Sequence, residues 1–125
     1  MAKPVKPRID RAREHRIEQE IVVDAYGPEE QALGWYAYMD DALQFPFLAR
    51  CADERATSPL QIGDEVEVVG MPPEEVCEHE MFVLTPGERR TLGVPLAQLA
   101  ALHADEHTHQ VIEDWQYWVE RGYRF

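Results

Sequence analysis

The sequence has few of the features that would place a protein in a membrane or outside the cell. Its 125 residues include only two cysteines, Cys51 and Cys77, without CxxC spacing, so we expect reduced thiols and no disulfide framework. No stretch approaches the roughly 18 apolar residues needed to cross a membrane. The N-terminus has no apolar run that could serve as a signal peptide. These absences predict a soluble, cytoplasmic protein with no membrane partner.

Basic residues are scarce beyond the N-terminal segment. Residues 1–16 contain six basic and two acidic residues, whereas residues 17–125 contain six basic and 22 acidic residues. The formal net charge is −12. A body this anionic repels phosphate backbones, so we expect no nucleic-acid partner unless the short basic arm acts alone. It attracts cations instead, and the alternative is that the acidity only maintains solubility.

Motifs of catalysis are also missing. The sequence contains no GxSxG, no GxGxxG and no phosphate-binding P-loop. For Cys77, whose neighbour His79 lies two residues away, we expect a small buried hydrophobe rather than a nucleophile. We therefore predict that the protein is not an enzyme.

The apolar content is sufficient for one folded domain. The chain is 45% hydrophobic and 10% aromatic, which argues against disorder despite the charge. We expect a disordered basic lead-in over residues 1–10, where Pro4 and Pro7 interrupt regular structure. A single domain would then span residues 11–122.

Helical spacing predicts two helices in the first third of the chain. Ile17 and Ile21 lie four residues apart within a helix predicted over residues 11–26, although the β-branched run at 21–23 leaves a strand as the alternative. Pro28 suits the first position of a second helix. The aromatic and apolar stripe that follows is more typical of a core than of a ligand cage.

The remainder of the chain predicts short strands and a last helix. Period-two alternation indicates strands at residues 45–51, 64–69, 80–84 and 91–95. A helical turn at 96–99 and an amphipathic helix over 111–119, capped near Asp105, follow. This order predicts an α+β fold with a small curled antiparallel sheet, flanked by N-terminal helices and a C-terminal helix. Our hypothesis for that sheet is an SH3-like barrel.

The densest polar feature lies in the long loop between the second and third predicted strands. Four carboxylates fall within seven positions there, namely Glu74, Glu75, Glu78 and Glu80. Like charges packed this closely repel one another, and a hard divalent cation would offset the repulsion. Calcium takes about six to eight oxygen ligands from carboxylates, carbonyls and water. The alternative is an exposed, solvated loop.

Two further acidic pairs lie at predicted element ends. Asp40 and Asp41 close the second helix, where the helix dipole disfavours negative charge, and such a broken rule hints at function. Asp53 and Glu54 lie in the loop after the first strand. The stretch 64–75 has acids at both ends but valines where an EF-hand needs ligands. Any calcium site must therefore be assembled from separate segments.

The histidines offer an alternative metal site. His103, His107 and His109 have the spacing H-x3-H-x-H, and two histidines four residues apart can chelate zinc. However, His103 precedes the expected start of the last helix, and no HExxH motif is present. We therefore favour a hard ion over zinc or copper.

Several segments in a fixed order resemble the CcbP-type calcium-binding proteins known from cyanobacteria. They are residues 20–26, 34–36, 43–47, 63–71, 77–83, 94–99 and 113–118, within a match of about residues 14–119. The resemblance implies a cytoplasmic, non-EF-hand protein that binds calcium through surface carboxylates. It also implies buffering or signalling rather than catalysis.

We therefore predict an intracellular Ca²⁺-binding protein, with ligands chosen by the charge argument. The first choices are Glu75, Glu78, Glu80, Asp40 and Asp41, and the second choices are Asp53, Glu54 and Glu74. Surface sites that keep several waters predict affinities in the micromolar-to-millimolar range. The alternative function is an SH3-like interaction module whose acidic face docks a basic protein partner.

Overall fold

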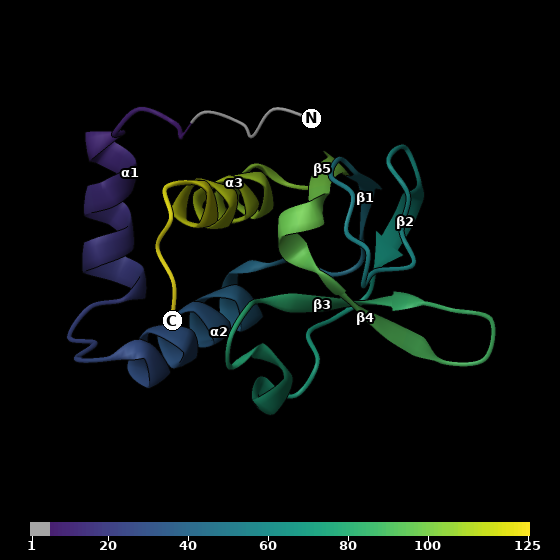
Figure 1. Ribbon diagram of the computed structural model, residues 1–125, viewed down its shortest axis with the longest axis horizontal. Coiled ribbons are helices and arrows are strands. Elements are labelled where there is room, and N and C mark those ends of the chain that lie inside the picture. The colour runs from purple at the N-terminus through teal and green to yellow at the C-terminus, as the bar shows by residue number, and fades with distance from the viewer. Residues whose placement is uncertain (1–5) are drawn as a thin grey trace.

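The structure, a computed structural model, describes residues 6–125, and its helices gather on one side while its strands occupy the other (Figure 1). This is the predicted α+β architecture. The first half of the predicted lead-in, residues 1–5, lies outside the described residues. Across the described part of the chain, no helix combines the length and the apolar character that a membrane crossing requires.

The N-terminal helix is shorter than its pattern predicted. Helix α1 (Arg11–Arg16) continues into a π-helical segment, η1 (Ile17–Ile21), and ends there rather than at residue 26. Ile17 and Ile21 are buried, as their spacing indicated, and no strand forms at 21–23. Helix α2 (Pro28–Ala42) begins at Pro28 as expected.

The end of η1 and the middle of α2 approach each other at a glycine. A Cβ atom at Gly34 would overlap the backbone carbonyl oxygen of Ile21. Because Gly34 has no side chain, the backbones of η1 and α2 can pack in direct contact.

In the part of the chain that the structure describes, five strands form two antiparallel sheets. They are β1 (Phe47–Cys51), β2 (Glu65–Val68), β3 (Phe82–Pro86), β4 (Thr91–Pro95) and β5 (Leu99–His103). One sheet has the order β2-β1-β5, and β3 pairs with β4 in the other. A bridge between Gly70 and Leu84 joins the two sheets. Four strands match the prediction to within two residues at each end.

The fifth strand and the sheet closure differ from expectation. The predicted helical turn at 96–99 is the 3-10 turn η3 (Leu96–Gln98), after which β5 pairs with β1 through Ala101 and Ala49. Among the residues of β5 only Leu99 is buried, so this strand does not alternate between buried and exposed positions. The described strands form no closed barrel, since a single bridge links the β3–β4 hairpin to the other sheet.

Tryptophans form the centre of the core. Helix α3 (Glu106–Glu120) is capped by Asp105, whose side chain accepts a hydrogen bond from the Thr108 amide, as predicted. Trp115 of this helix packs edge-on against Trp35 of α2, with ring centroids 5.0 Å apart. Trp118 stacks on Trp115 and packs at a tilt against Trp35. The aromatic stripes are thus core, as the sequence indicated.

Candidate functional site

The second half of α2 lies against the acidic loop, and one tyrosine holds the two together. The hydroxyl of Tyr36 donates a hydrogen bond of 2.5 Å to the carbonyl of Pro72. Two prolines restrict the backbone at this point, and residues Glu74–Cys77 then form a 3-10 turn, η2. The sequence predicted an irregular loop here, but the segment that begins at Glu74 forms a regular turn.

Cys77 anchors the other end of this turn. Its side chain is buried, and its Sγ accepts a hydrogen bond of 3.4 Å from the amide of Phe82. Burial raises the pKa of the thiol, so Cys77 is a neutral packing group, in agreement with the expectation of a small buried hydrophobe. With Tyr36 on one side and Cys77 on the other, η2 presents its glutamates outward from a fixed backbone.

Three exposed carboxylates act electrostatically on the Tyr36 phenol. Asp40 follows Tyr36 by one helical turn, so the two residues share a face of α2. Glu74 and Glu75 approach from η2. Burial raises the pKa of Tyr36, and the negative charges of these three residues raise it further, together with the nearby Cys77. Acidic side chains that are far apart in the chain therefore act on one phenol.

A groove between α2 and η2 contains the next group of carboxylates. It encloses about 780 Å³ and is open to solvent. Glu78 lines it together with Glu74 and Glu75, and Glu29 and Glu30 line it from the first turn of α2. Glu78 therefore lies on the same surface as η2.

Glu80 belongs to a different arrangement. It forms a two-point ion pair with Arg55, with distances of 2.7 Å from Nη1 to Oε1 and 2.6 Å from Nη2 to Oε2. The hydrogen bond that Arg55 donates to Glu80 raises the pKa of Arg55, and the negative charge of Asp53 adds to this effect. Of the four loop carboxylates, Glu80 alone thus has a cation already beside it in the described structure.

The remaining acidic candidates lie apart from both groups. Asp41 is exposed and follows Asp40 on α2, about 100° further round the helix axis. Glu54 is exposed in the loop after β1, beside Asp53. The predicted set of eight residues is therefore divided into the α2–η2 surface, the Arg55 group and two outlying positions.

The donor atoms of the α2–η2 surface suit a hard ion. They are carboxylate oxygens, which match calcium or magnesium rather than zinc or copper. Within residues 6–125, no three His, Cys, Asp or Glu side chains converge closely enough to enclose a metal ion. An ion bound here would complete its coordination with water or backbone carbonyls, and this requirement fits calcium's flexible geometry.

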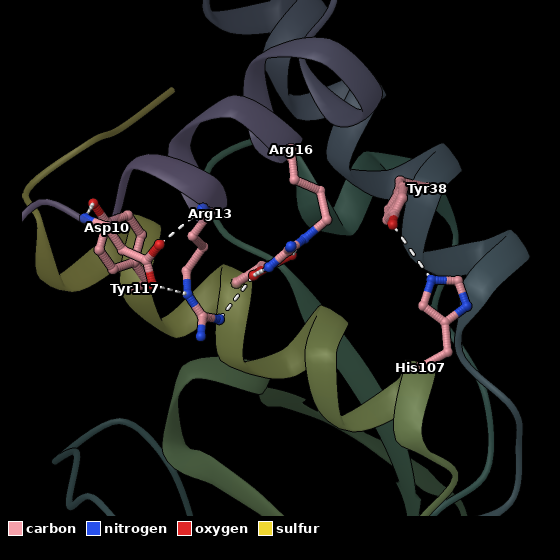
Figure 2. Close-up of polar contacts among 7 residues, drawn as sticks. Asp10, Arg13, Arg16, Tyr38, His107 and Tyr117 are labelled. Atoms are coloured by element: carbon pink, nitrogen blue, oxygen red, sulfur yellow. Dashed lines mark hydrogen bonds and ion pairs between the residues drawn. The ribbon is translucent and has the colours of Figure 1, made fainter.

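The fold does not support the alternative metal site made of histidines. His103 ends β5, whereas His107 and His109 lie on α3. His107 makes a long contact of 3.4 Å with the hydroxyl of Tyr38 (Figure 2). No metal-binding cluster forms among these histidines in the described part of the chain.

Two residues of this region were not singled out in the sequence. Tyr36 was assigned only to the apolar stripe of α2, although its spacing of four residues from Asp40 was visible. Arg55 had no local signal, because its partner Glu80 is 25 residues away. Only the fold brings that pair together.

Comparison with known proteins yields two similar structures. A family model described as calcium binding, of the CcbP type, matches residues 15–119. The crystal structure of Anabaena CcbP is 39% identical, with a TM-score of 0.84, over 98% of this chain and 100% of that one. A calcium-binding protein in its calcium-binding form is also 39% identical, with a TM-score of 0.82, over 93% and 95% of the two chains. No curated protein matches the sequence.

Proposed function

This chain belongs to the CcbP family of calcium-binding proteins, and from that premise we propose that it binds Ca²⁺ on the α2–η2 surface. The proposed ligands are Asp40, Glu74 and Glu75, with Glu78 as a further contributor. The support for this assignment is that the first three all raise the pKa of one phenol, Tyr36, whose hydroxyl is bonded to the loop at Pro72. Mutual repulsion among these charges would be relieved by a divalent cation.

The other predicted ligands are assigned a secondary role in calcium binding. Glu80 and Asp53 lie near the Arg55 guanidinium, which competes with a metal ion for the same oxygens. Asp41 and Glu54 are exposed positions outside the two groups. We retain these four as sites of weaker, secondary calcium binding.

We propose a buffering role with modest affinity. An exposed site that needs water to complete its coordination is expected to bind in the micromolar-to-millimolar range. EF-hand sensors respond to calcium by reorienting paired helices. Here α2 packs on α3 through Trp35 and Trp115, so calcium would bind with little movement of the helices. Strong calcium-dependent binding of a hydrophobic dye would argue for a sensor instead.

The role is one of binding rather than catalysis, and its proposed location is the cytoplasm. The family's calcium-binding character supports the first statement. The second is supported by two cysteines that are buried as unpaired thiols, which suits a reducing compartment.

Calorimetric titration with calcium, in a background of magnesium, tests the proposal. Wild type should release or absorb heat with calcium alone. Asp40→Asn and the double variant Glu74→Gln/Glu75→Gln should each weaken binding by about tenfold or more. Asp41→Asn is the matched control, because it removes an equal charge one residue away, and it should bind nearly as wild type does.

Three results would contradict the assignment. Silence up to millimolar calcium would remove the function itself. Equal losses in Asp40→Asn and Asp41→Asn would show that only net charge matters. A loss confined to Asp53→Asn/Glu54→Gln would move the site to the loop after β1.

A further inference from the structure

The groove between α2 and η2 combines apolar surface with carboxylates, which a calcium site alone does not require. Leu33 of α2 is 51% exposed and Tyr26, just before that helix, is 90% exposed, and both line the groove. Its volume of about 780 Å³ lies within the usual range of ligand-binding clefts. Exposed apolar side chains gathered in a concave surface typically mark an interaction site.

The charge of the groove has one sign. Glutamates stand on both walls, from the first turn of α2 and from η2. His79 is the only His, Lys or Arg among the residues that line it in the described structure. The groove therefore favours cationic groups and disfavours phosphate, which excludes nucleic acid and anionic lipid as occupants.

An aromatic side chain already lies against one end of the groove. Phe125 stacks on Trp115, with ring centroids 5.7 Å apart, and packs at a tilt against Trp118, with ring centroids 5.2 Å apart. Phe125 also lines the groove. The lining of the groove therefore already accommodates an aromatic ring.

We propose that this groove binds a segment of a partner protein in which Arg or Lys residues stand beside leucine or phenylalanine. The basic groups would pair with glutamates on the two walls, and the apolar groups would cover Leu33 and Tyr26. Electrostatic complementarity would set the register of the segment, and the buried apolar contact would supply most of the affinity.

Calcium and this segment compete for the groove. Glu74 and Glu75 belong both to the groove and to the calcium site, so this second part rests on the proposed function. Competition is reciprocal, because each ligand must lower the affinity of the other by the same factor. Rising calcium would thus release the partner.

A synthetic peptide, acetyl-Arg-Leu-Arg-Phe-Arg-amide, probes the groove on the full chain. One reference peptide has Gln in place of each Arg, and a second has Ser in place of Leu and Phe. Calorimetry should show binding of the first peptide and at least about tenfold weaker binding of both references. Amide chemical shifts in NMR spectra should move around Tyr26, Leu33 and Glu75.

Two matched variants separate docking from calcium binding. Leu33→Ser should weaken the peptide about tenfold while leaving calcium binding unchanged, because Leu33 offers no oxygen ligand. Ile62→Ser removes an apolar side chain that is 63% exposed outside the groove, and it should change neither ligand. Both positions are exposed, so each variant should retain the wild-type melting temperature.

The outcomes distinguish the two proposals. Equal binding of the Arg and Gln peptides, or full binding to Leu33→Ser, would overturn the docking site even if calcium binds normally. Peptide binding that calcium fails to displace would leave the groove supported and would remove the calcium site from Glu74 and Glu75. Shifts centred on Arg55 and Glu80 would overturn the choice of groove.

Discussion

Arg16 of α1 and Asp114 of α3 form a two-point ion pair, with 2.8 Å from Nε to Oδ2 and 2.7 Å from Nη2 to Oδ1. Arg13 adds a third contact of 2.8 Å to Oδ1. The Asp114 side chain is fully buried, whereas each arginine is about one-fifth exposed. One buried carboxylate thus fastens the N-terminal helix to the core. The hydrogen bonds that Arg16 donates to Asp114 raise the pKa of Arg16 accordingly.

Asp114→Asn should lower the free energy of unfolding by about 3 kcal/mol, the low end for breaking a buried pair, because the two arginines can regain water. The new amide group would also direct N–H atoms at guanidinium N–H atoms. Urea unfolding followed by tryptophan fluorescence measures the change. Glu113→Gln, an exposed neighbour on the same helix, should change it little. An unaltered stability for Asp114→Asn would show that α1 is held by its apolar residues alone.

Gly34→Ala tests the contact between α2 and η1. Helix propensity by itself favours alanine by about 1 kcal/mol. The added Cβ would overlap the Ile21 carbonyl oxygen, and a backbone atom cannot move aside without shifting η1. We expect a net destabilisation of about 1–3 kcal/mol in thermal or urea unfolding. Ala37→Gly, at an exposed position of α2, calibrates the propensity effect, and a stabilised Gly34→Ala would contradict the close approach.

Calcium should lower the pKa of Tyr36. Besides burial, nearby carboxylates raise that pKa because they repel the tyrosinate anion, so a bound cation that offsets their charge must lower it. Ultraviolet difference spectra of tyrosinate, recorded during alkaline titration with and without calcium, measure the change. Subtracting the Tyr36→Phe variant isolates the signal. Tyr38, whose pKa is raised by burial and then by Glu20 and Asp114, should not respond. A calcium effect that persists in Tyr36→Phe would place the ion elsewhere.

Acid should remove the contribution of Asp105 to stability. Hydrogen bonds from Thr108 hold the pKa of this capping carboxylate below its usual value. A group whose folded pKa is lowered stabilises the fold above its unfolded pKa, and this contribution is lost as pH falls through the folded value. Asparagine caps a helix without titrating in this range. Asp105→Asn should therefore lose less stability than wild type between neutral pH and acid, as measured by urea unfolding at each pH. Parallel losses in the two proteins would contradict this.

Local features of the sequence predicted most of the secondary structure. Pro28 at the start of α2 and Asp105 at the cap of α3 act on backbone groups only a few residues away, so their effect is visible without a fold. The buried alternation Phe47, Ala49, Cys51 likewise reports one face of β1. The strand β5 was missed because its apolar residues do not alternate, and only its pairing with β1 makes it a strand.

The sequence by itself determined that the protein is acidic, lacks an EF-hand and carries carboxylates in separate clusters suited to a hard ion. Only the tertiary structure decided which of them share a surface. The hydrogen bond from Tyr36 to Pro72 holds the loop against α2, so Glu74 and Glu75 act on the same phenol as Asp40, whereas Glu80 pairs with Arg55. Charge repulsion and hydrogen bonding depend on distance in space, which the spacing of residues along the chain does not contain.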